Sequence, residues 1–259
     1  ISLGYGEDDY KYFLYTCVIN AVAGGLLLLY GRGAENRMSR RDGYCVVTLS
    51  WLFFTVFGML PFYFSGSIDT ITNAFFETMS GFTTTGATIL DDIESLSHGM
   101  LFWRSLTQWI GGLGIVFFTI AILPIFTTGG VQLFSAETTG VTHDRTHPKI
   151  NVMAKWLWTI YLILTVSETI LLMFGGMDLF DAICQSFATT ATGGYSTKQN
   201  SISYWNSPYI EYVVAIFMII SSINFSLFLM CLKGKVSRLF KDEETHWFLA
   251  SVGILTLLI

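Results

Sequence analysis

The sequence predicts an all-α membrane protein made of repeated units, each containing a long helix, a re-entrant loop and a second long helix. Two observations predict this class. Of the 259 residues, 52% are hydrophobic and only 13% are charged, whereas average soluble domains carry about a quarter charged residues. The apolar residues also form runs of two lengths, and each short run leads into a threonine-rich stretch that contains glycine. The composition excludes a disordered chain and favours an integral membrane protein.

Five apolar runs are long enough to span a bilayer of roughly 30 Å at 1.5 Å per helical residue. They cover residues 12–30, 43–65, 99–126, 152–175 and 209–232. A sixth run begins at His246 and is still apolar at Ile259. Because this last run is too short to span, we expect the sequence to be an internal or incomplete part of a longer protein.

The basic residues indicate the orientation of these helices. Most of the 14 lysines and arginines lie in or beside three linkers, and most acidic residues lie in the alternate linkers. The basic residues of the first group are Arg32, Arg37, Arg40, Arg41, Arg145, Lys149, Lys155, Lys233, Lys235, Arg238 and Lys241. The positive-inside rule places these linkers in the cytoplasm.

Two short apolar runs, 71–82 and 179–189, fall on the outer side of this arrangement. At roughly 12 residues each, they reach only about halfway across the bilayer as helices. Asp69-Thr70 precedes the first run and Asp178 precedes the second, and these residue types are typical of helix N-caps. We therefore predict two half helices that enter from outside and direct their partially negative C-terminal ends toward the membrane centre, where they favour a cation.

The stretches that follow the half helices form an internal repeat. The first loop is 83–88 and the second is 190–195. Placing Gly86 on Gly193 gives an offset of 107 residues (193 − 86) and also brings Thr83 onto Thr190. We predict four segments: an N-terminal helix and linker at 1–42, a first repeat at 43–150, a second at 151–241, and the start of a third at 242–259.

Several motifs resemble the bacterial TrkH branch of the Trk/Ktr/HKT potassium-transport superfamily. They are Arg41-Asp42-Gly43, Thr83-Thr84-Thr85-Gly86-Ala87-Thr88, Gln108-Trp109-Ile110-Gly111-Gly112-Leu113-Gly114, Ile122-Leu123-Pro124, Phe180-Asp181-Ala182-Ile183 and Gly193-Gly194-Tyr195-Ser196-Thr197. The resemblance implies four non-identical units with pseudo-fourfold symmetry around one pore in the bacterial inner membrane. Only two of the four loops lie in this sequence, so we expect unseen chain to supply the others and the gate. The resemblance also implies contact with membrane lipid, a homodimer and a cytosolic nucleotide-binding ring of the TrkA type, but no nucleic acid.

The resemblance further implies which residues bind the ion. Rings of backbone carbonyls can replace the hydration shell of K⁺, and glycine permits the positive φ that such a loop needs. Alignment with the family filter assigns carbonyl ligands for K⁺ to Thr84, Thr85, Gly86, Ala191, Thr192 and Gly193. It assigns support of the filter to Thr83, Ala87, Thr190 and Gly194. The alternative is that both stretches are ordinary glycine turns at the outer surface.

Other polar and small residues within the apolar runs have two interpretations each. Glu168 is expensive to ionise inside a helix and is a functional candidate, although a structural partner would also satisfy it. Asn224 is expected to bond across helices, and the alternative is that it contacts the ion. Glu77 is a candidate for the vestibule. Gly111, Gly112 and Gly114 indicate close helix packing or, alternatively, a gating hinge.

These observations favour potassium uptake by channel-like conduction over three alternatives. A secondary transporter would couple K⁺ to Na⁺ or protons through broken helices, and a structural subunit would not conduct. An intramembrane enzyme has little support, because the sequence contains no HExxH, no GxSxG and no paired intramembrane aspartates. We therefore predict a transporter that is not an enzyme.

Overall fold

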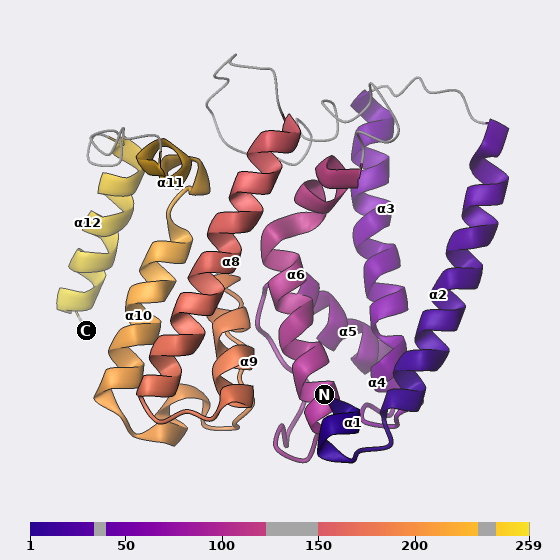
Figure 1. Cartoon of the computed structure of the whole chain (residues 1–259), viewed down its shortest axis with the longest axis horizontal. Coiled ribbons are helices and arrows are strands. Elements are labelled where there is room, and N and C mark those ends of the chain that lie inside the picture. Colours follow the sequence, from indigo (N-terminus) through magenta and orange to yellow (C-terminus); the bar gives the residue numbers. More distant parts are fainter. Residues whose placement is uncertain (34–39, 123–149, 233–241, 259) are drawn as a thin grey trace.

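The computed structural model describes residues 1–33, 40–122, 150–232 and 242–258, and within these ranges the chain forms helices and loops without strands. The helices α3 (Arg40–Gly58), α6 (His98–Ile122), α8 (Ile150–Phe174) and α10 (Pro208–Ser222) pack in this order (Figure 1). At one side, α2 (Tyr10–Tyr30) contacts α4 (Leu60–Phe64). The remaining elements are α1 (Ser2–Tyr5), η1 (Gly31–Gly33), η3 (Ser201–Trp205), α11 (Phe225–Leu232) and α12 (Glu243–Leu258).

The two half helices form where the sequence predicts them. They are α5 (Ile71–Phe82) and α9 (Leu179–Thr190), of 12 residues each, and they lie in the same half of the molecule (Figure 1). Asp178 caps α9 by accepting hydrogen bonds from the backbone N–H groups of Phe180 and Asp181. The first cap is Thr70 rather than Asp69, because the Thr70 hydroxyl accepts from the N–H of Asn73 at 3.2 Å.

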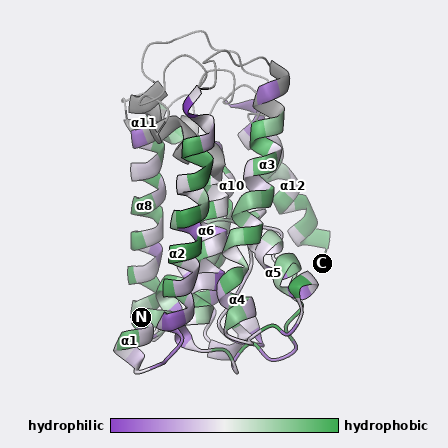
Figure 2. Cartoon of the chain, turned by 90° about the vertical axis from the view of Figure 1, so that its right-hand side faces the viewer, coloured by the Kyte–Doolittle hydropathy of each residue, from purple (hydrophilic) through white to green (hydrophobic). Residues whose placement is uncertain are grey.

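Three of the predicted spans are confirmed by helices that are long and apolar enough to cross a membrane. Among the described residues these are Tyr10–Gly33, Cys45–Phe64 and Lys155–Phe174. Figure 2 shows α2 and α3 as mainly hydrophobic over much of their length. The predicted membrane class therefore agrees with the structure.

The other two predicted spans are not continuous helices. The run 99–126 corresponds to α6, in which Gly114 leaves helical geometry with φ 66° and ψ 153°. The run 209–232 is divided into α10 and α11, because Ile223 is extended (φ −77°, ψ 144°). The next helix starts after Asn224, whose carbonyl accepts from the N–H of Leu227. The sequence predicts that Asn224 lies inside a long helix. In the structure it lies instead at the break between α10 and α11.

Small residues let α5 approach its neighbours closely. A Cβ atom on Gly81 would collide with the Thr107 hydroxyl of α6, and one on Gly58 would lie 2.7 Å from the Phe82 ring. Such contacts are typical of helix packing in membranes, where small residues allow backbones to approach. They hold the C-terminal end of α5 against α3 and α6.

Parts of the sequence prediction fall outside the described residues. These include Leu123, Pro124 and most of the basic residues that predict the orientation, namely Arg37, Arg145, Lys149, Lys233, Lys235, Arg238 and Lys241. The segment boundaries at 42, 150 and 241 stay predictions.

Candidate functional site

The two loops share an unusual backbone conformation. After α5, Thr84 has φ 53° and Gly86 has φ 76°; after α9, Thr192 has φ 55° and Gly194 has φ 84°. A β-branched residue rarely adopts positive φ, because this conformation is strained. Residues with strained backbones are often found at functional sites. Because the sign of φ alternates along each loop, successive carbonyl groups can face the same side of the chain. Both loops therefore have the backbone form that a row of carbonyl ligands requires.

The structure corrects the spacing of the repeat by one residue. The half helices begin at Ile71 and Leu179, and the strained threonines are Thr84 and Thr192, so equivalent residues are 108 apart (192 − 84). The hydrogen bonds have the same offset, since the N–H of Thr85 bonds the carbonyl of Ser80 and that of Gly193 bonds Ala188. Gly86 is thus equivalent to Gly194, and not to Gly193 as residue identity suggests.

The two loops touch through their backbones. A Cβ atom on Gly86 would collide with the carbonyl oxygen of Gly193. Within this contact Gly193 is buried, whereas Thr192 and Gly194 are exposed in the described part of the chain. A Cβ atom on Gly194 would meet no described residue within 4 Å. The backbone thus places the equivalent glycines, Gly86 and Gly194, on neighbouring loops.

The glycine motif that follows the first loop, Gly111-Gly112-Leu113-Gly114, lies on α6 and contacts both half helices. A Cβ atom on Gly111 would collide with the carbonyl oxygen of Phe82, and one on Gly112 would lie 2.7 Å from the Cα atom of Ala191. These two glycines therefore pack against the ends of both half helices. Gly114 forms the kink, and a Cβ atom on it would meet no described neighbour within 4 Å. The motif combines packing at two positions with a bend at the third.

Gln108 on the same turn holds the second loop. Its Oε1 atom accepts a hydrogen bond from the N–H of Tyr195 at 3.1 Å. Its side chain also lies against Gly193, where a Cβ atom would be 2.7 Å from Nε2. The Nε2 atom is buried and has no hydrogen-bond partner among the described residues. Gln108 therefore fixes the backbone immediately after the second loop.

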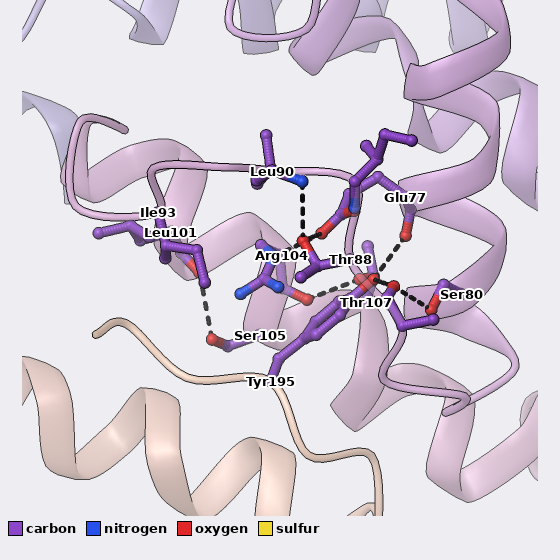
Figure 3. Close-up of polar contacts among 12 residues, drawn as sticks. Glu77, Ser80, Thr88, Leu90, Ile93, Leu101, Arg104, Ser105, Thr107 and Tyr195 are labelled. Carbon is purple, nitrogen blue, oxygen red and sulfur yellow. Dashed lines mark hydrogen bonds and ion pairs between the residues drawn. The ribbon is translucent and has the colours of Figure 1, made fainter. Parts of the chain in front are cut away.

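A buried ion pair lies behind the loops. Arg104 of α6 and Glu77 of α5 are 2% and 0% exposed at their side chains, and Arg104 Nε donates to Glu77 Oε1 at 2.7 Å (Figure 3). Glu77 also accepts from the hydroxyl of Thr88 at 3.0 Å and from the N–H of Ile89 at 2.9 Å. The expectation that Glu77 faces a vestibule is therefore wrong, because the carboxylate is enclosed by donors from α6 and the end of the first loop.

Tyr195 joins this ion pair to both loops. The Arg104 guanidinium carbon lies 3.6 Å from the centre of the Tyr195 ring, and Arg104 Nη1 donates to the carbonyl of Ser196 at 2.9 Å. The Tyr195 hydroxyl lies within hydrogen-bonding distance of the carbonyl oxygens of Glu77 (2.8 Å) and Ala87 (3.2 Å). Figure 3 shows the ring extending from the second loop toward the first.

The residues predicted to support the filter have defined contacts. The Thr83 hydroxyl donates to the carbonyl of Met79 at 2.7 Å and lies 2.8 Å from the Thr85 hydroxyl. The Ala87 carbonyl accepts from Ser80 at 2.6 Å as well as from Tyr195. The Met79 carbonyl and the Ser80 hydroxyl brace the first loop from its own unit, and the Tyr195 hydroxyl braces it from the second unit.

Glu168 of α8 supports the second loop from behind. Its Oε2 atom accepts from the hydroxyl of Thr190 at 3.3 Å, and its side chain is fully buried. Its Oε1 atom has no hydrogen-bond partner among the described residues. The structural partner that the sequence leaves open for Glu168 is thus the last residue of α9.

Sequence reasoning missed Arg104, Gln108 and Tyr195 as parts of the site. A signal for the first was present, because an arginine inside an apolar run calls for a buried partner, and Glu77 is the acidic residue of the first half helix. Gln108 and Tyr195 belong to motifs that carry the family resemblance, but their contacts arise between residues 87 positions apart. No local pattern indicates such a pairing.

Comparison with known proteins gives consistent matches. The family of cation transport proteins called TrkH matches residues 10–259. The chain is 42% identical over 252 residues to the Trk system potassium uptake protein TrkH of Escherichia coli strain K12, which covers 96% of this chain and 52% of that protein. It is 38% identical over 262 residues to the protein of the same name from Halomonas elongata, covering 99% and 54%.

A solved structure shows the same fold. The crystal structure of the potassium transporter TrkH from Vibrio parahaemolyticus matches with a TM-score of 0.84 at 32% identity, covering 99% of this chain and 53% of that one. The chain spans about half the length of the curated relatives it matches.

Proposed function

Because this chain belongs to the TrkH family of cation transport proteins, we propose that it carries half of the lining of a potassium-selective path. It is a multi-pass protein of the bacterial inner membrane, as its family and its apolar helices indicate. The single observation that carries the proposal is the duplicated loop. In each unit a strained threonine lies two residues after the end of a half helix, and a glycine with positive φ follows two residues later.

The proposed ligands are backbone carbonyls, because K⁺ must exchange its water shell for oxygens of similar number and spacing. In the first loop they are those of Thr84, Thr85 and Gly86. In the second loop, the backbone equivalence transfers the same roles to Thr192, Gly193 and Gly194. This moves the second set one residue along from the alignment by residue identity and replaces Ala191 with Gly194.

The half helices add a favourable field. The C-terminal end of each carries a partial negative charge from unpaired carbonyls, and each loop begins at that end. Two neighbouring loops provide part of a ring, so the proposal requires two further loops of the same kind to enclose the ion. K⁺ is then taken up by conduction through the centre of this ring.

Two partnerships are also proposed from the family. A second copy of the protein would form a homodimer, and a cytosolic TrkA-type nucleotide-binding ring would regulate it. Crosslinking of the full-length protein in native membranes tests the first. Co-purification with the candidate ring protein from the same cells tests the second.

The proposal is tested by a matched pair of glycine substitutions in the full-length protein. Gly194 and Gly176 both have positive φ, 84° and 95°, and a Cβ atom on either meets no atom within 4 Å among the residues that the structure describes. Alanine should therefore cost each position a similar strain of about 1–2 kcal/mol. We expect Gly194→Ala to lower the ratio of K⁺ to Na⁺ flux in liposomes, and Gly176→Ala, in the turn before α9, to leave it unaltered.

Three results would count against conduction through these loops. Equal flux ratios in the two variants would show that the second loop does not select the ion. Currents that depend on a Na⁺ or proton gradient, instead of reversing at the potassium equilibrium potential, would favour the coupled transporter. Transport that persists when both Gly86 and Gly194 are replaced would leave this chain a structural subunit.

A further inference from the structure

We propose that Tyr195, held by Arg104 and Glu77, sets the spacing between the first and second loops and thereby determines ion selectivity. We call these three residues the inter-loop bridge. The inference rests on the proposed function, because it assigns a positioning role within the same filter.

The first step is that the inter-loop bridge joins the second loop to two parts of the first unit, α5 and the first loop. Tyr195 ends the second loop, and its hydroxyl contacts the carbonyl of Ala87 in the first loop at 3.2 Å and that of Glu77 in α5 at 2.8 Å. The tyrosine ring is 2% exposed, so water does not compete for these bonds. A displacement of one loop is thus transmitted to the other.

The second step is that the ring itself is fixed in place. Arg104 stacks on one face at 3.6 Å and donates to Ser196, the next residue along the chain. Arg104 is in turn anchored by Glu77 at 2.7 Å. The planar guanidinium can make these contacts together because its donors are arranged in a rigid fork, which a lysine lacks. The Tyr195 side chain therefore has little freedom to follow a moving loop.

The third step concerns why an ion pair is buried here at all. A buried pair is weak evidence for stability, because desolvation offsets most of its attraction, and its best-attested use is to fix one arrangement among several. The pair lies behind two loops whose backbones already touch at Gly86 and Gly193. Selectivity between K⁺ and Na⁺ depends on the distances between carbonyl oxygens or on how freely they move. Both quantities change if the loops separate.

The test uses Tyr195→Phe in the full-length protein reconstituted in liposomes. This substitution removes one hydroxyl and keeps the ring beneath Arg104. We expect Na⁺ flux to rise relative to K⁺ flux by about fivefold, the factor that corresponds to one neutral hydrogen bond. The matched control is Tyr161→Phe, another buried tyrosine whose hydroxyl donates to a helix carbonyl, that of Trp109 at 3.0 Å. It should keep the wild-type ratio.

A second variant keeps the test decisive if Tyr195→Phe fails to fold. Arg104→Lys retains the charge but cannot hold Glu77 and Ser196 together, so it should also raise the relative Na⁺ flux. Wild-type flux ratios in every folded variant of the pair would overturn the inference. A wild-type protein that does not discriminate K⁺ from Na⁺ would instead overturn the proposed function.

Discussion

At the scale of single residues, the site depends on backbone groups that side chains hold from behind. Thr84 and Thr192 adopt a conformation that threonine disfavours, and such strain persists only where neighbours enforce it. Gln108, Tyr195 and Glu168 supply that enforcement through Tyr195 N–H, the Ala87 carbonyl and the Thr190 hydroxyl. The backbone conformation is therefore shared by the two loops, while the supporting side chains differ between them.

Replacing Gln108 by leucine tests this support. The N–H of Tyr195 would lose its acceptor in a buried position, which costs about 1–3 kcal/mol. We expect a lower unfolding temperature in detergent. The control is Gln185→Leu in α9, a buried glutamine that bonds the Thr189 side chain at 3.4 Å. It should be affected less, and a reversed order of the two unfolding temperatures would contradict the role of Gln108.

At the scale of elements, α6 determines where both loops lie. Its Gly111 and Gly112 contact the end of α5 and the residue that follows α9, and its Gln108 and Arg104 bond the second loop and its flank. The segment 104–112 of α6 thus contacts both the first and the second repeat. The bend at Gly114 begins after these contacts are complete.

A pair of glycine-to-alanine substitutions measures this packing. In α6, a methyl group on Gly111 would collide with the Phe82 carbonyl, whereas in α2 one on Gly25 would meet nothing within 4 Å. We expect Gly111→Ala to destabilise the protein by about 1–3 kcal/mol. Gly25→Ala should be neutral or stabilise by up to about 1 kcal/mol. Thermal unfolding and the yield of monodisperse protein compare them; equal stability would mean that α6 can shift away from α5.

The sequence predicts the half helices well because their signals are local. Residues 71–82 and 179–189 stand out by length, and the caps precede them, so α5 matches and α9 is one residue longer. The break at Ile223 was missed, because the apolar run continues through it. The repeat was displaced by one residue because Gly193-Gly194 offers two glycines for one role. The position at which α9 ends shows that Gly194 is the equivalent of Gly86. An alignment by residue identity contains no information on where the helix ends.

At the scale of the whole molecule, the orientation in the membrane is still a prediction from charge. It is tested with cysteines in a background that lacks Cys17, Cys45, Cys184 and Cys231. Asp91 lies between the first loop and α6, and Arg32 follows α2; both are exposed. We expect a membrane-impermeant maleimide to label Asp91→Cys in intact spheroplasts and Arg32→Cys only after permeabilisation. The opposite pattern would invert the topology and place both loops at the cytoplasmic face.

The contact between Tyr195 and Ala87 runs in one direction, since the equivalent residue of the first loop is alanine and cannot return it. The order of synthesis of the two residues limits when this contact can form during biosynthesis. Tyr195 is translated 108 residues after Ala87 (195 − 87), which at about 5–20 residues per second takes about 5 to 20 s. During that interval Ala87 has been synthesised and Tyr195 has not, so the contact between them cannot form. The first loop therefore gains this last support only after the second loop has been synthesised.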